Sequence, residues 1–191
     1  MLITEDILKK MTFKFDAPYG EDRLKELILY IGDKCKEDPA FGATKLNKIL
    51  YFADFISFSR YGDPVTGVEY MRLGQGPAPK HLLPISRQMQ ADKELFIEKR
   101  DYFGRDQLRA IPMREANLNL FKPRDIAMVD EQIAALWGEN ADRVSERSHG
   151  IAWKMFEDKE SIPYEASYLS NSLRTNEDVD WAQELITKYG W

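Results

Sequence analysis

Cysteine is nearly absent from this sequence of 191 residues. Because Cys35 is the single example, the chain cannot close an internal disulfide or build a zinc site from several cysteines. A chain without disulfides suits a reducing compartment. The first residues include Glu5 and Asp6 in place of the basic and apolar regions of a secretory signal, so we expect a cytoplasmic location.

Long apolar runs are also absent. The densest apolar stretch extends from Leu46 to Phe58 and is interrupted by Asn47, Lys48 and Asp54. A membrane-spanning helix needs roughly 18 or more consecutive apolar residues. The sequence therefore predicts that the chain does not cross a membrane.

Histidine is scarce, and His81 and His149 are the two examples. No serine lies in a Gly-x-Ser-x-Gly elbow, and Gly74-Gln75-Gly76 lacks the third glycine of a dinucleotide-binding loop. Cys35 could pair with a histidine, but it lies on the apolar side of a predicted helix, which favours a buried structural thiol. We assign no catalytic residue and no cofactor.

One pair of residues has the spacing of half a metal site. Glu146 precedes His149 by three positions, and Asp142 adds an oxygen nearby. A histidine that makes structural hydrogen bonds is the favoured interpretation, and we assign no metal ligand. A metal-dependent hydrolase using His149 is kept as a less favoured alternative.

The chain carries 32 acidic and 27 basic residues, a net charge of −5, which opposes binding to phosphate backbones. The densest basic group comprises Lys99, Arg100, Arg105 and Arg109. Asp101 and Asp106 interrupt this group, as is typical of the solvated face of a hairpin. Nucleic acid is therefore a disfavoured partner, although a DNA-binding regulator of its own operon stays open as an alternative function.

Hydrophobic residues make up 43% of the chain, enough for the core of one domain. Apolar residues recur at helical spacing in residues 21–36, and again after Thr44, a predicted N-cap. The second helix is apolar on more than one side and ends at Tyr61-Gly62-Asp63-Pro64. We expect it to lie in the centre of the domain.

The rest of the chain mixes short strands with helices. Residues 67–73 alternate like a strand, 74–79 form a predicted loop, and a helix runs toward Ala91. Residues 94–100 and 107–112 predict a hairpin that turns at Gly104, with Leu95, Ile97 and Leu108 facing inward. Further helices are predicted at 125–137, after Asn140 and, capped by Asn176, at 177–188. The fold class is mainly α (α+β), a single compact helical domain with a small antiparallel sheet or hairpin.

Aromatic residues are dense near the loops, often beside arginines such as Arg60 and Arg72. Tyrosine, tryptophan and arginine frequently anchor protein interfaces. A core with solvated edges explains the same pattern equally well. The residues concerned are Tyr51, Tyr61, Tyr70, Trp153, Tyr164 and Tyr168.

Four ordered motifs resemble those of the Panacea domain family, which comprises SocA-like antitoxins and GepA-like phage-associated proteins. They are the run from Thr44 to Asp54, the steps Tyr61-Gly62 and Thr66-Gly67, the loop Gly76-Pro77-Ala78-Pro79, and Ser148-His149 followed by Trp153. The resemblance covers residues 21–164. It leaves residues 1–20 as an N-terminal arm and 165–191 as a helical extension packed on the domain. Ala78 departs from the valine more usual there, and residues 94–114 do not align.

The resemblance implies a protein-binding antitoxin, not an enzyme, that neutralises a cognate toxin by direct complex formation. The acidic chain would suit a basic toxin, and a homodimer stays open. The motif residues could support the fold, which we favour, or contact the partner. These candidate residues are Lys45, Tyr51, Tyr61, Gly76, Pro77, Ser148, His149 and Trp153.

Overall fold

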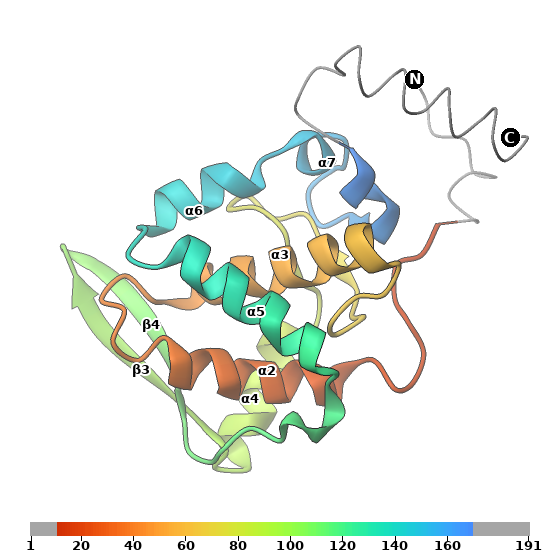
Figure 1. Ribbon diagram of the computed structural model, residues 1–191. Helices are drawn as coiled ribbons and strands as arrows, with labels where there is room; N and C mark the ends of the chain where they lie inside the picture. Colours follow the sequence, from red (N-terminus) through yellow and green to blue (C-terminus); the bar gives the residue numbers. More distant parts are fainter. Residues whose placement is uncertain (1–10, 170–191) are drawn as a thin grey trace, which may run out of the picture.

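The computed structural model describes residues 11–169, most of which are helical or lie in loops between helices (Figure 1). The expected helix at residues 177–188 lies outside this range. The helices are α2 (Glu21–Lys34), α3 (Ala43–Tyr61), α4 (Leu82–Ala91), α5 (Pro123–Leu136), α6 (Ala141–Ser148) and α7 (Ile151–Lys154), with 3-10 turns η1 (Leu118–Leu120) and η2 (Tyr164–Tyr168).

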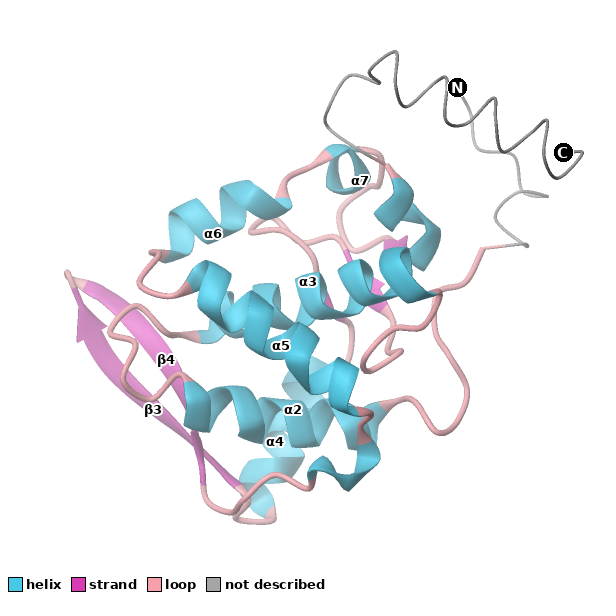
Figure 2. Cartoon of the chain, viewed as in Figure 1, coloured by secondary structure: helices cyan, strands magenta, loops and turns pink. Residues whose placement is uncertain are grey.

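Two small antiparallel sheets accompany the helices (Figure 2). One is the predicted hairpin of β3 (Leu95–Tyr102) and β4 (Arg105–Pro112), in which Leu95 lies opposite Pro112. The other has the order β2-β1-β5 and joins β2 (Ala78–Pro79), β1 (Tyr70–Met71) and β5 (Ser161–Ile162). The prediction of a strand over 67–73 and a loop over 74–79 is therefore wrong in part, because the strand is shorter and the loop contains β2. The mainly α, α+β fold class is confirmed.

Helix α3 runs through the middle of the molecule, as expected from apolar residues on more than one of its sides (Figure 1). It contacts α5, α6, β2 and η2, and Ile49, Leu50 and Ala53 are fully buried. Each buried leucine or isoleucine of this kind stabilises the fold by about 1.5–3 kcal/mol. The helix ends where predicted, because Gly62 takes a left-handed conformation with φ of 72°.

The start of α3 differs from the prediction by two residues. Gly42, not Thr44, is the N-cap residue, and no side chain caps this end of the helix. The Thr44 hydroxyl instead bonds to the Gln75 side chain at 3.4 Å, which links the first turn of α3 to the loop before β2.

A buried carboxylate ties the β2-β1-β5 sheet and η2 to α3. Asp54 is fully buried and accepts hydrogen bonds from the backbone N–H and hydroxyl of Thr66 and from the hydroxyls of Tyr70 and Tyr164. Burial raises the pKa of this carboxyl, and the hydrogen bonds act in the opposite direction. Four donors thus replace the water that the carboxylate loses on folding.

Arg109 fastens the hairpin to the end of α2, which corrects its assignment to a solvated basic group. Arg109 is 2% exposed, and its guanidinium donates to the backbone carbonyls of Cys35, Lys36, Asp38 and Phe41. One of them, the carbonyl of the C-cap residue Cys35, has no partner inside the helix.

The predicted inward face of the hairpin is also wrong in part. Leu95 is buried and Ile97 is half-buried against the core, but Leu108 is 44% exposed. In β4 the buried positions are Gln107, Arg109 and Ala110. The polar side chains of Gln107 and Arg109 take the space against the loop before α3.

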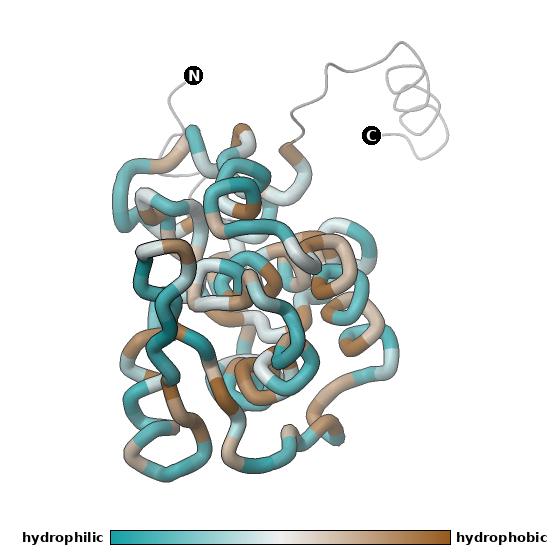
Figure 3. Tube along the Cα trace, turned by 90° about the vertical axis from the view of Figure 1, so that its left-hand side faces the viewer, coloured by the Kyte–Doolittle hydropathy of each residue, from teal (hydrophilic) through white to brown (hydrophobic). Residues whose placement is uncertain are grey.

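Hydrophobic and hydrophilic residues are interspersed along the described chain (Figure 3). The apolar residues of the helices pack against one another in a single core. Within residues 11–169, no helix combines the length and the apolarity that crossing a bilayer requires.

Candidate functional site

A lysine lies buried in the middle of the domain without a carboxylate partner. Lys48, on α3, is 1% exposed, and its ammonium group donates to the carbonyl of Pro77 at 2.9 Å. Within residues 11–169 no carboxylate pairs with it, so burial alone lowers its pKa to about 7. A buried cation of this kind is costly and therefore marks a position where polarity has a purpose.

The loop before β2 presses against this lysine. A Cβ atom on Gly76 would lie 2.6 Å from Lys48 Nζ and 2.2 Å from Ser148 Oγ. Gly76 also has φ of +95°, which side chains rarely allow. Glycine is therefore required here, both by the backbone conformation and by the lack of space.

The junction of α6 and α7 forms the other side of this buried site. Ser148, the last residue of α6, is buried and donates to the carbonyl of Ser145 at 2.7 Å. The His149 ring stacks on Trp153 at 4.0 Å between centroids, and Trp153 Nε1 donates to the carbonyl of Leu73 at 2.9 Å. The guanidinium of Arg72 lies 4.1 Å from the Trp153 ring centroid. The hydrogen bond to Leu73 and the contact with Arg72 hold the start of the loop before β2 against α7.

The cations around His149 affect its charge. Burial lowers the pKa of its imidazole, and nearby Lys48 and Arg72 lower it further, while Glu146 acts in the opposite direction. The Nε2 atom of His149 is buried without a hydrogen-bond partner. Across residues 11–169, no three histidine, cysteine, aspartate or glutamate side chains gather in a metal-binding group.

We call this set of residues the Lys48 cluster. It unites five of the eight residues predicted from the motifs with Lys48, which the prediction did not include. The cluster consists of Lys48, Gly76, Pro77, Ser148, His149 and Trp153.

The other three predicted residues lie elsewhere. Lys45 forms a buried ion pair with Asp38 at 2.6 Å. Tyr51 is buried among aromatic residues and packs 4.5 Å from Phe55 between ring centroids. Tyr61 lies at the end of α3, 49% exposed, with the guanidinium of Arg124 5.0 Å from its ring centroid.

Lys48 could have been suspected from the sequence. It interrupts the densest apolar stretch of the chain, in a predicted helix that is apolar on more than one side and so leaves little room for an exposed face. Asp54 interrupts the same stretch and is buried as well. A charged residue inside an otherwise apolar central helix is the feature of the sequence that could have predicted these buried positions. Cys35, in contrast, is buried as predicted, and burial raises the pKa of its thiol to about 12.

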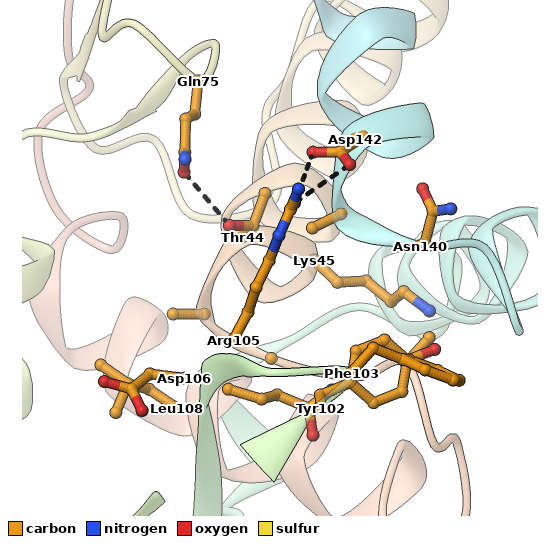
Figure 4. Close-up of a pocket in the computed structure, with 15 residues that line it drawn as sticks. Thr44, Lys45, Gln75, Tyr102, Phe103, Arg105, Asp106, Leu108, Asn140 and Asp142 are labelled. Atoms are coloured by element: carbon orange, nitrogen blue, oxygen red, sulfur yellow. Dashed lines mark hydrogen bonds and ion pairs between the residues drawn. The ribbon is translucent and has the colours of Figure 1, made fainter. Parts of the chain in front are cut away.

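An open groove lies on the surface beside the Lys48 cluster (Figure 4). It encloses about 570 Å³ between the end of the hairpin, the first turn of α3 and the start of α6. The loop of the cluster contributes Gln75, which bonds to Thr44 at one side of the groove. We call this surface the hairpin groove, lined among others by Thr44, Gln75, Tyr102, Phe103, Arg105, Leu108 and Asp142. The predicted residue Lys45 also belongs to its lining.

The Lys48 cluster and the hairpin groove thus share one loop. Gly76 and Pro77 anchor the loop to the buried cluster, while Gln75 faces the groove. Lys48, Gly76, Pro77 and Ser148 are buried and fix the position of the groove wall, whereas His149 and Trp153 are half-buried. This arrangement can present a preformed surface to a partner, supported by buried residues that the partner would not touch.

A family model described as antitoxin SocA-like, Panacea domain matches residues 46–154, more than half of the chain. The matched range includes every member of the Lys48 cluster and the whole hairpin. No curated protein and no solved structure matches the chain.

Proposed function

Because the chain belongs to the family of SocA-like antitoxins with a Panacea domain, we propose that it binds a toxin protein directly and neutralises it within the complex. This mode of action needs no cofactor and no catalytic residue. The complex would form in the cytoplasm, where both partners are made.

The observation that carries this proposal, beside the family, is the hairpin groove. Phe103 stands 87% exposed at its edge, and exposed aromatic side chains are frequent anchors of protein interfaces. The loop that carries Gln75 at one side of the groove is fixed by the contacts of Gly76 and Pro77 with Lys48, so binding would require little rearrangement there. A preformed surface of this kind suits a module that acts by covering its partner.

The basic group in the hairpin gives little support to the DNA-binding alternative. Arg109 is buried, and the other three cations pair with Asp106, Glu98 and Asp142. Such pairing leaves few free positive charges to contact phosphates.

The test is co-expression of the tagged protein with the product of its adjacent gene. We expect the neighbour to be toxic alone, and growth to be restored together with a stable complex that survives purification. A control strain expresses Leu50→Asp, which places a charge in the core and should abolish rescue by preventing folding. A toxic neighbour that is neither bound nor neutralised by the wild-type protein would contradict the proposal for that pair.

A further inference from the structure

A second, smaller groove lies where α3, the end of α6 and η2 meet. It encloses about 230 Å³, and its lining includes the buried residues Tyr51, Phe55 and Ala166. Phe52 and Ile56 of α3 also line it and are half-buried against the core. We call this surface the η2 groove. Its largest side chains are apolar or aromatic, so it suits an apolar occupant.

The charged residues of the η2 groove select no occupant, because they are already paired. They are Arg60 and Arg147, and each bonds to a glutamate outside the lining. Arg60 donates to both carboxylate oxygens of Glu131 at 2.8 and 3.0 Å, and Arg147 donates to Glu139 at 3.0 Å. Apolar contact must therefore supply most of the affinity for an occupant.

The described part of the chain ends at this groove. Leu169 is its last residue, lines the groove and is 43% exposed. Residues 170–191 continue from there, and a segment tethered so closely has an effective concentration in the millimolar range. Residues 1–10 connect instead through Thr12, which is outside the lining and donates its backbone N–H to Glu165 at 2.9 Å. Connectivity thus favours the C-terminal segment as the occupant.

The sequence of that segment has an apolar side. In the helix predicted at 177–188, Asp180 and Glu184 fall on one side and the large apolar residues on the other. Residues 170–176 can span up to about 24 Å when extended, enough to let this helix lie along α3. The apolar residues are Val179, Trp181, Ala182, Leu185 and Ile186.

From these observations we infer that residues 170–191 dock in the η2 groove of their own chain. The apolar side of the 177–188 helix lies against Phe52 and Ile56, and docking covers the exposed surface of Leu169. A partner protein can then reach this groove only by displacing the segment. The inference goes beyond the proposed function and does not involve the toxin.

The test asks whether the groove of the full-length protein is already occupied. A fluorescent peptide of residues 170–191 is titrated against the wild type and against Leu185→Asp, whose own segment should detach because a charge enters its apolar side. We expect the peptide to bind Leu185→Asp at least about tenfold more tightly by fluorescence anisotropy, since the tethered segment competes with it in the wild type. Equal binding to both proteins, or binding to neither, would overturn the inference.

A second substitution in the Leu185→Asp protein identifies the surface that binds the peptide. Ser59→Glu places a larger, charged side chain at an exposed position of the groove lining, so the fold should persist while peptide affinity falls about tenfold. The matched control is Gln90→Glu, which adds the same carboxylate at an exposed position of α4 outside the groove and should leave the affinity unchanged. The same affinity in both double variants would mean that the peptide binds elsewhere, contrary to the inference.

Two further results would assign the groove to another occupant. An unlabelled peptide of residues 1–11 should not displace the labelled one, and displacement would identify the N-terminal segment instead. Blocking of the groove in the wild type should not depend on protein concentration, and blocking that increases with concentration would identify a second copy. Either result overturns the inference and leaves the proposed function untouched, because no toxin enters these measurements.

Discussion

A lysine without a counter-charge is the most unusual residue of the Lys48 cluster. An apolar side chain of similar length would fill the same space in α3 without a desolvation cost, but it could not bond the Pro77 carbonyl. Lys48 therefore lowers the stability of the fold through its desolvation cost, but its hydrogen bond fixes the position of the loop that contains Gly76 and Gln75. Such a loss of stability is expected where the position of the loop determines the shape of a binding surface.

The lowered pKa of Lys48 predicts how stability depends on pH. Between about 7 and 10.5 the unfolded chain holds a proton on this lysine that the folded protein lacks, so stability rises with pH in that window. The contribution is roughly 1.4 kcal/mol per pH unit. Below about pH 7 both states are protonated and the contribution no longer changes.

Urea unfolding of the wild type and Lys48→Met at several pH values checks this. The difference in free energy of unfolding between the two proteins should shift in favour of the wild type as the pH rises from about 7.5 to about 9. Lys36→Met, which removes an exposed lysine, should follow the wild type. Parallel curves for Lys48→Met and the wild type would show that this lysine keeps its ordinary pKa.

Gly76 gives a second prediction at this scale. In Gly76→Ala the new methyl group would lie 2.2 Å from Ser148 Oγ at a position with φ of +95°, so we expect a loss of about 2–4 kcal/mol. Gly74→Ala is the matched control, because nothing lies within 4 Å of its Cβ position and its φ is not in the left-handed range. Thermal unfolding measures both, and equal melting temperatures would refute the crowding at Gly76.

At the scale of elements, local signals in the sequence predicted the helices well. Apolar spacing lies within the helix that it predicts, and cap residues such as Gly62 and Asn140 lie directly beside it. Asn140 caps α6 as expected. Strand β2 was missed because proline-rich segments resemble loops, and only pairing with Tyr70 and Met71 makes Ala78 and Pro79 a strand. The face of the hairpin depends in the same way on α2, which is remote in sequence.

The contacts of Arg109 allow the stability gained from packing the hairpin against α2 to be measured. Its planar guanidinium reaches four carbonyls at once, whereas the ammonium of a lysine has three donors at a single point. We expect Arg109→Lys to lower the free energy of unfolding by about 2–3 kcal/mol in urea titrations. Arg105→Lys changes an exposed arginine of the same strand and should stay within about 0.5 kcal/mol of the wild type. A loss in Arg109→Lys no larger than in Arg105→Lys would mean that the carbonyl contacts add nothing.

At the scale of the whole molecule, the motifs led to the family but to only one side of the hairpin groove, where Thr44 and Lys45 lie. The predicted residues of the Lys48 cluster come from two segments that are far apart in the sequence and meet around Lys48, as residues with a shared structural role would. The first segment contains Gly76 and Pro77, and the second contains Ser148, His149 and Trp153. Phe103 and Asp142, in contrast, belong to no motif, and only the fold brings the hairpin beside α6. Motifs that serve packing identify the fold, while the contact surface depends on how separate elements are placed.

Residues that stabilise the fold, such as Gly76, and residues exposed at the groove, such as Phe103, should affect neutralisation in different ways. Gly76→Ala should weaken growth rescue through loss of folded protein, so lowering the culture temperature should restore it. Phe103→Asn should leave the amount of folded protein unchanged and fail to rescue at every temperature, because it removes a contact and not stability. Soluble protein level and rescue, measured together at two temperatures, separate the two behaviours. If cooling restored both variants alike, the groove would have no special part in neutralisation and Phe103 would matter only for folding.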